Sequence, residues 1–205
     1  FQKKQNIELG ELAFYDSNVE NINLPIGTKL EASCFGFCKN LHKIILPEGL
    51  ENIPSDCFFG TDIHSVELPS SLKRIEGGAF NTNSYFNSGL DSISFPLGLS
   101  FIGGRAFYYN NNLKEIRVPS TLEKIENEAF SGCNLQKVYA YTVLPISISQ
   151  NTFDNFSNIS LYVPTQSVDN YYLNTQWSQF KEIHEFNEPY KYFYLDKEFT
   201  LDNKR

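Results

Sequence analysis

One segment of 22 or 23 residues is repeated along most of this chain. An apolar residue followed by proline recurs at Leu24-Pro25, Leu46-Pro47, Leu68-Pro69, Phe95-Pro96, Val118-Pro119 and Val163-Pro164. A small residue followed by phenylalanine recurs at Ala13-Phe14, Cys34-Phe35, Cys57-Phe58, Ala79-Phe80, Ala106-Phe107, Ala129-Phe130 and Thr152-Phe153. A fixed period in the range of about 20 to 50 residues is the signature of a solenoid, in which each repeat buries its apolar side against its neighbours. The repetition therefore predicts a stack of similar coils.

The most regular copy runs over Pro119–Phe130 and is preceded by Leu113–Val118. Its blocks L-x-x-I-x-x-x-A-F and L-x-x-I-x-[LV]-P resemble the BspA-type leucine-rich repeat, a bacterial class of the leucine-rich repeat superfamily. The resemblance covers about residues 7 to 186. It implies a mostly-β leucine-rich repeat solenoid of the α/β superfamily, a curved right-handed coil of about seven repeats. It also implies a parallel sheet on the concave face and a helical cap at the C-terminal end.

The repeat divides the chain into three segments. We expect the solenoid over residues 1–163, with its first and last coils degenerate, a cap of the same domain over 164–186, and a tail over 187–205. Trp177, Phe180 and Ile183 are spaced three residues apart, which places them on one face of a helical turn. We therefore expect Trp177 to be a core residue of the cap rather than a platform for a ligand. The tail is either a β-hairpin or the start of a further segment.

Charge and hydropathy exclude two classes of partner. The net charge is −7 at neutral pH, whereas nucleic acids and anionic membranes attract basic surfaces. No apolar run reaches the roughly 18 residues that a membrane-spanning helix needs, so we predict no membrane insertion.

The chain begins at Phe1, contains no Met and shows no signal peptide, which favours a mature or truncated chain. Exposed sheet edges at its ends predict a monomer or a weak dimer.

The strand that precedes each proline supplies the candidate binding residues. Side chains alternate in direction along a strand, so the neighbours of its central buried residue face outward, and parallel stacking sets them in rows. The outward residues that we select as candidate partner contacts are Lys43, Glu67, Glu115, Arg117, Lys137, Tyr139 and Tyr162. Tyr is enriched in interfaces, which favours a surface for a protein or a glycan. An ordinary solvated sheet face remains an equal alternative for any single residue.

The fourth coil carries an insertion of about five residues between Phe80 and Pro96. Per-repeat insertions map to loops on one face of a solenoid, and such loops can bind partners. Tyr85 and Phe86 are two aromatic residues in this otherwise polar loop. They could anchor a partner, but packing back over the core is favoured because burial of a large apolar side chain stabilises it by about 2 kcal/mol.

The sequence contains no pattern that names a reaction. His42 and His64 occupy the same position in consecutive coils, but zinc sites need three or four ligands and we find no Cys or carboxylate to complete one. Cys34, Cys38, Cys57 and Cys133 fall on repeat positions, which favours four buried reduced thiols. A nucleophile elbow, an H-E-x-x-H motif and a dinucleotide-binding fingerprint are all missing from the sequence. We therefore expect no enzyme activity, no metal site and no cofactor.

Two functions remain open at this point. The first is a secreted or cell-surface recognition module that binds a host matrix protein, another cell or a glycan, through the concave sheet face or the insertion in the fourth coil. The family resemblance implies this function, and solenoids offer extended concave surfaces. The alternative is a structural spacer that holds other domains apart and binds nothing. A fold hosts many functions, so the resemblance does not choose between the two.

Overall fold

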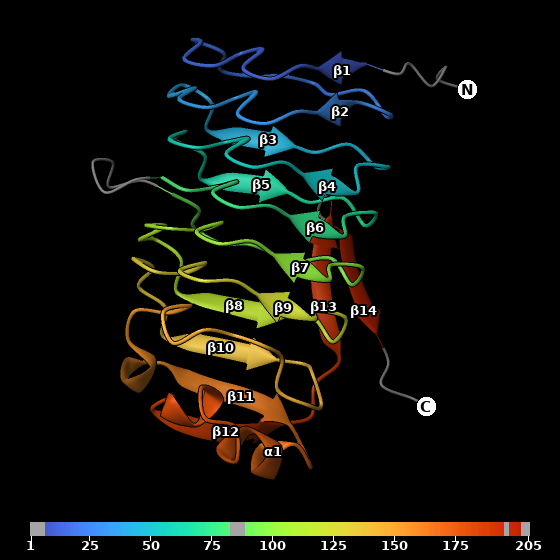
Figure 1. The fold of residues 1–205 in the computed structure, drawn as a ribbon. Helices are drawn as coiled ribbons and strands as arrows, with labels where there is room; N and C mark the ends of the chain where they lie inside the picture. Colours follow the sequence, from blue (N-terminus) through green and yellow to red (C-terminus); the bar gives the residue numbers. More distant parts are fainter. Residues whose placement is uncertain (1–6, 83–88, 195–196, 202–205) are drawn as a thin grey trace.

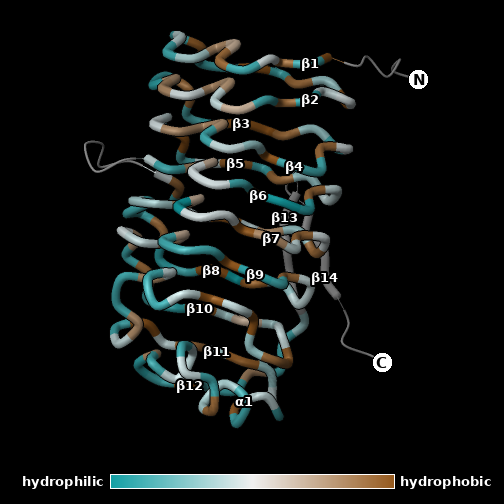
Figure 2. The backbone as a smooth tube through the Cα atoms, viewed as in Figure 1, coloured by the Kyte–Doolittle hydropathy of each residue, from teal (hydrophilic) through white to brown (hydrophobic). Residues whose placement is uncertain are grey.

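The computed structural model describes residues 7–82, 89–194 and 197–201. The chain winds into a parallel β-solenoid of about eight turns with little helix, and the coils lie one above another from β1 to β12 (Figure 1). This is the leucine-rich repeat solenoid that the sequence predicts. Hydrophilic and hydrophobic stretches alternate within every coil along the whole stack (Figure 2). Each coil therefore buries one side of its short strands against the coils above and below it.

The coils contribute strands to two columns. The first column contains the strands before Pro47, Pro69 and Pro119 and those in line with them: β3 (Lys43–Ile45), β5 (Ser65–Glu67), β8 (Glu115–Val118), β10 (Lys137–Ala140), β11 (Ser160–Pro164) and β12 (Glu182–Phe186). The second column contains β1 (Glu8–Leu9), β2 (Lys29–Leu30), β4 (Asn52–Ile53), β6 (Arg74–Ile75), β7 (Phe101–Ile102) and β9 (Lys124–Ile125). All strand pairs in both columns are parallel. The sequence predicts the first column, whereas the second column is an addition from the structure.

Both columns are interrupted. The first column consists of the pair β3-β5 and the sheet β8-β10-β11-β12, and the second consists of the pair β1-β2 and the sheet β4-β6-β7-β9. The first break falls at the coil with the insertion, where residues 89–95 form no strand. The side chain of Asn110 is fully buried there: its amide donates to the Phe80 carbonyl at 2.8 Å and its oxygen accepts from the Leu90 N–H at 2.8 Å. Asn110 thus fixes both ends of the insertion to the next coil.

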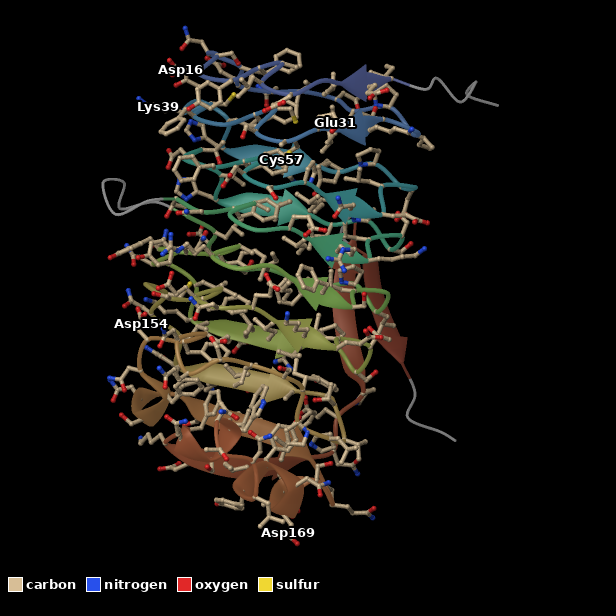
Figure 3. All side chains as sticks on the ribbon, viewed as in Figure 1. Asp16, Glu31, Lys39, Cys57, Asp154 and Asp169 are labelled. Atoms are coloured by element: carbon tan, nitrogen blue, oxygen red, sulfur yellow. The ribbon has the colours of Figure 1, made fainter. Side chains whose placement is uncertain are left out.

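A column of phenylalanine rings runs through the core. The rings of Phe14, Phe35, Phe58, Phe80, Phe107, Phe130 and Phe153, which we call the phenylalanine spine, stack with centroids 5.1 to 5.6 Å apart and interplanar angles of 4° to 11°. Cys34 and Cys57 precede two of these rings and are fully buried, with their sulfur atoms 3.4 Å apart. Figure 3 shows Cys57 inside the stack, whereas Asp16, Lys39 and Asp154 lie along its outer edge.

Each coil turns sharply just before its spine phenylalanine. The turn residue adopts a positive φ between 55° and 67° in six coils, at Leu12, Ser33, Asp56, Gly78, Arg105 and Glu128. Gly78 is the one glycine among these six residues. Gly103 has a different role, because a Cβ at this residue would lie 2.5 Å from the backbone nitrogen of Gly77. Gly103 is therefore required for the close approach of two coils.

The C-terminal segment closes the stack with short helices and one further strand. α1 (Val168–Tyr172) and the 3-10 turns η1 (Phe156–Asn158) and η2 (Trp177–Gln179) precede β12. Trp177 is fully buried, as predicted, and its indole N–H donates to the Ile146 carbonyl at 2.9 Å. Within the expected cap, residues 164–186, β12 pairs in parallel with β11 and extends the sheet. Beyond it, β13 (Tyr190–Tyr194) and β14 (Lys197–Leu201) form an antiparallel hairpin.

Candidate functional site

The sheet β8-β10-β11-β12 carries a row of partly buried side chains on its outward face. Its parallel register aligns four of them, one from each strand: Arg117, Tyr139, Tyr162 and His184, which we call the ladder. Parallel pairing at this register places side chains of equivalent positions directly beside one another. The ladder therefore follows from the repeat itself, since its members are separated by 22 or 23 residues along the chain.

The ladder members contact one another face to face. The Arg117 guanidinium lies 4.1 Å from the ring centroid of Tyr139. The rings of Tyr139 and Tyr162 stack at 4.6 Å, and the rings of Tyr162 and His184 stack at 5.0 Å. Both faces of each tyrosine are thus covered by a neighbour. The ladder consequently presents ring edges, hydroxyl groups and a guanidinium edge to its surroundings, rather than open aromatic faces.

Neighbouring residues hold the guanidinium of Arg117 in place. Arg117 donates to the hydroxyl of Tyr141 at 3.3 Å and to the carboxylate of Glu115 at 3.3 Å. Partial burial disfavours its charge, but the contacts with Tyr141 and Glu115 outweigh this effect and raise the pKa of Arg117. Burial raises the pKa of Tyr141, against the opposing effect of Arg117. At neutral pH the pair is therefore a cation beside a neutral phenol.

An aromatic group supports the ladder from one side. The ring of Phe186, at the end of β12, meets Tyr141 edge-on at 4.6 Å and Tyr139 edge-on at 6.0 Å. Edge-to-face contacts of this kind stabilise aromatic pairs by about 0.5 to 1.5 kcal/mol beyond area burial. Together with the stacking contacts they limit the rotamers of Tyr139, so the ladder is rigid before any partner binds.

The structure brings together five of the seven predicted strand residues. Glu115, Arg117, Lys137, Tyr139 and Tyr162 lie on one sheet, and Glu115 aligns with Lys137 in the row beside the ladder. The other two, Lys43 and Glu67, lie on the separate β3-β5 pair and form an ion pair with each other at 2.9 Å. The rows that we expected are therefore divided between two sheets. Tyr85 and Phe86 of the insertion lie outside the described residues.

The sequence reasoning did not include His184, Tyr141 and Phe186 among the site residues. His184 follows Tyr162 by 22 residues and occupies the next position of the same row. Its ring nitrogen Nε2 lies 2.9 Å from a carboxylate oxygen of Glu182. Extending the repeat period one step beyond Tyr162 would have located His184, because the period is the signal that places the other ladder residues.

The histidine pair of the second and third coils has a carboxylate that we did not expect. The ring centroids of His42 and His64 lie 6.1 Å apart, and the carboxylate of Asp62 contacts a nitrogen of each ring. The expectation that no carboxylate completes this pair was therefore wrong. Asp62 lies in the turn before β5, outside the strand positions that the repeat aligns, so the spacing of the repeat gave no indication of it.

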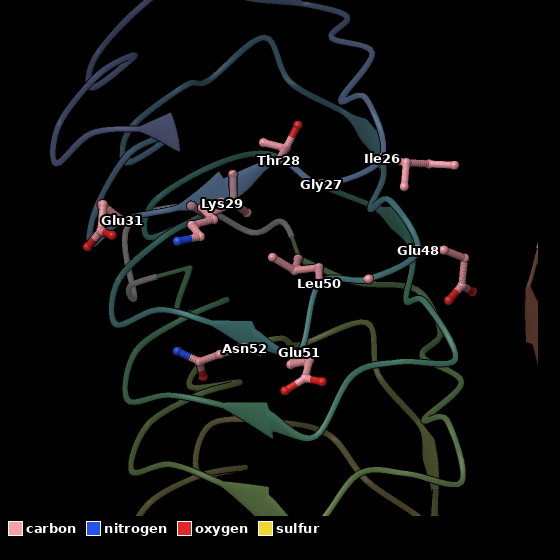
Figure 4. Close-up of a pocket in the computed structure, with 11 residues that line it drawn as sticks. Ile26, Gly27, Thr28, Lys29, Glu31, Glu48, Leu50, Glu51 and Asn52 are labelled. Carbon is pink, nitrogen blue, oxygen red and sulfur yellow. The ribbon is translucent and has the colours of Figure 1, made fainter. Parts of the chain in front are cut away.

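A shallow pocket of about 590 Å³ marks the break in the second column. It lies between β2 and β4 and is lined by residues 26–31 and 48–52 (Figure 4). Two of its carboxylates already have partners in the next coil: Glu48 accepts from Ser70, and Glu51 from Lys73 at 2.9 Å. The pocket therefore coincides with missing strand pairing, and two of its charged groups are used in contacts between coils.

In the part of the chain that the structure describes, none of the helices has the length and the apolar character that crossing a bilayer would demand. The candidate surface itself is a sheet face of mixed polarity.

A family profile agrees with the fold. The sequence profile described as "BspA type Leucine rich repeat region" matches in six copies over residues 3–87 and 81–194. No curated protein matches the sequence. Among solved structures, a leucine rich cell surface protein from Faecalibacterium prausnitzii A2-165 is similar, with 16% identity and a TM-score of 0.48. The similarity covers 91% of this chain and 72% of that protein's chain.

Proposed function

The chain belongs to the BspA-type leucine-rich repeat family, and from this premise we propose that it is a non-enzymatic recognition module, secreted or on the cell surface. Its ligand is a protein that binds the ladder face, which we define as the outward face of β8, β10, β11 and β12. The observation that supports this proposal is the rigid row of Arg117, Tyr139, Tyr162 and His184. Tyr and Arg are the residue types that dominate the binding energy of interfaces.

Rigidity favours binding at this surface. Association costs about 0.5 to 1.5 kcal/mol for each flexible side chain that becomes immobilised. Tyr139 is already stacked on both faces, and the guanidinium of Arg117 already has two hydrogen-bond partners. Much of that ordering is therefore complete before a partner arrives. A preorganised surface of this kind stabilises a complex without a large entropic cost.

The geometry of the ladder favours a protein over a glycan. A sugar ring binds aromatic residues through their open faces, but Arg117 and His184 cover the outer faces of the two tyrosines. The exposed groups are ring edges, hydroxyls and the side chains of Glu115 and Lys137, which suit polar contacts across a protein interface. The net charge of −7 disfavours nucleic acids and anionic membranes as partners.

A binding screen tests the proposal. The tag-free protein is screened at physiological salt against purified extracellular matrix proteins and a glycan array. The test variant changes Arg117, Tyr139 and Tyr162 to Ala. The matched control changes Arg74, Phe101 and Lys124 to Ala on the second column, where the Arg74 guanidinium lies 3.9 Å from the ring centroid of Phe101. Thermal unfolding confirms that both variants are folded.

We expect a saturable matrix-protein ligand whose affinity falls at least tenfold in the ladder variant and stays within twofold in the control. Equal affinity in both variants would exclude the ladder face. A hit on the glycan array alone would replace the protein ligand with a glycan. No ligand for the folded wild-type protein would favour the alternative, a structural spacer between other domains.

A further inference from the structure

We propose that His42, Asp62 and His64 form a binding site for a divalent transition-metal ion of the zinc class, bridging the second and third coils. The site is separate from the ladder face, since it lies on the β3-β5 part of the stack. Each of the three side chains offers one ligand atom, and these atoms all lie within 4.8 Å of one another.

The backbone holds the two imidazoles in neighbouring positions. His42 and His64 each directly precede the strand of their coil, and the His64 N–H donates to the His42 carbonyl at 2.9 Å. Their rings are nearly parallel, with an interplanar angle of 26°. This hydrogen bond is one of the backbone hydrogen bonds that join neighbouring coils, so the solenoid fixes the spacing of the two histidines.

Asp62 supplies the third ligand. One of its carboxylate oxygens lies 3.2 Å from Nδ1 of His42, and the other lies 3.5 Å from Nε2 of His64. In a tetrahedral zinc site, ligands about 2.0 to 2.1 Å from the ion are separated from one another by about 3.3 Å. The two separations, each to a different oxygen of Asp62, are close to this value, so the three groups can surround an ion once their side chains adjust.

The second nitrogen of His64 also faces a carboxylate. Asp91 Oδ1 lies 3.9 Å from Nδ1 of His64, and the same oxygen accepts a hydrogen bond from the amide of Asn112 at 3.0 Å. Metal-binding imidazoles are almost always oriented by a carboxylate, carbonyl or water on their other nitrogen. Asp91 occupies the position in the next coil that corresponds to His64, since its N–H donates to the His64 carbonyl. At 3.9 Å its carboxylate is beyond direct hydrogen-bond distance, so we infer that it orients the imidazole as a nearby charge or through a bridging water.

The ligand set determines the class of ion. Two imidazole nitrogens and one carboxylate suit zinc and its neighbours in the first transition row, whereas magnesium and calcium prefer oxygen ligands alone. Three protein ligands leave at least one coordination position for water or for a partner's side chain. The side chains are between one third and two thirds exposed, so the ion can enter directly from solvent.

Isothermal titration calorimetry with ZnCl₂ tests this site on tag-free, chelator-treated protein. We expect one ion per chain, with affinity reduced at least tenfold in His64→Ala and in Asp62→Asn. Asp91→Asn is expected to weaken binding by about tenfold without abolishing it, as loss of an orienting group does. His184→Ala is the matched control, because His184 is a histidine paired with a carboxylate outside the metal site. The zinc affinity of this variant should equal that of the wild type.

Two further measurements decide whether the metal is bound here. Zinc should raise the melting temperature of the wild type but not that of the His42→Ala/His64→Ala double variant, because only folded protein with the site gains binding energy. The absorption spectrum of the Co²⁺ form should lack a thiolate charge-transfer band. Wild-type protein that binds no zinc, undiminished binding in the double variant, or a thiolate band from the buried cysteines would each overturn the proposal.

Discussion

The ring of Phe107 stacks on that of Phe130 with their centroids 5.1 Å apart and their planes inclined by only 6°. Its opposite face stacks on Phe80 at 5.5 Å, so Phe107 has a spine neighbour on each side. Phe14, at the end of the phenylalanine spine, is partly exposed and stacks only on Phe35 among the spine rings. The spine therefore allows one substitution to be compared at an inner and an outer coil.

We predict that Phe107→Ala destabilises the protein by about 3 to 5 kcal/mol, as removal of a buried phenylalanine does. Phe14→Ala should cost less than half as much, because it opens a cavity against one coil only and the stability of a solenoid depends on contacts between neighbouring coils. Urea unfolding followed by circular dichroism measures both values. Equal losses would show that the end coil is as tightly coupled as the centre.

The contact between Gly103 and the preceding coil gives a second prediction. A Cβ at Gly103 would lie 2.5 Å from the nitrogen of Gly77 and 2.7 Å from the carbonyl carbon of Glu76, both of which are backbone atoms. Gly103→Ala should therefore push the two coils apart and cost about 1 to 3 kcal/mol, as overpacking does.

Gly10→Ala is the matched control for this substitution. Nothing lies within 4 Å of a Cβ at Gly10, so the variant should remain within about 0.5 kcal/mol of the wild type. Differential scanning calorimetry of the two variants gives the comparison. A melting temperature of Gly103→Ala that matches the wild type would mean that the coils separate at no cost.

The repeat made the first strand column and the spine predictable, because both follow from spacing alone. Arg117, Tyr139 and Tyr162 could be assigned to one row for the same reason. The two-residue strands of the second column, such as Asn52–Ile53, are too short to show the alternation that marks a strand in a sequence. Their pairing depends on the neighbouring coil, which a local pattern does not reveal.

Asp62 was missed because it lies outside the strand positions that the repeat aligns. It takes its place through the segment before β5, which spacing does not set. The break of the first column at residues 89–95 is likewise not set by spacing, since these residues follow the insertion and form no strand although Asp91 remains in register with His64. Position within a coil is encoded locally, whereas contacts made by turns and insertions depend on the assembled stack.

The buried phenol of Tyr171 makes the stability of the cap depend on pH. Its side chain is fully buried, donates to the Thr142 carbonyl at 2.9 Å and lies 2.6 Å from the Thr142 hydroxyl. Burial raises the pKa of Tyr171 to about 12 from the ordinary value of 10.0, despite the opposing effect of the Thr142 hydrogen bond. Between these values the folded state keeps a proton that the unfolded state releases.

Stability contributed by the neutral phenol should therefore be complete below pH 10 and be lost as the pH rises to 12, in total about 3 kcal/mol. Tyr171→Phe cannot ionise at this position, so it should be less stable than the wild type at pH 9, where it lacks the hydrogen bonds to Thr142, and more stable near pH 12. Urea unfolding monitored by the fluorescence of Trp177, whose ring centroid lies 5.2 Å from that of Tyr171, measures the crossover. Tyr172→Phe, at an exposed neighbouring residue, should show no crossover with the wild type, and parallel pH curves for the wild type and Tyr171→Phe would contradict the prediction.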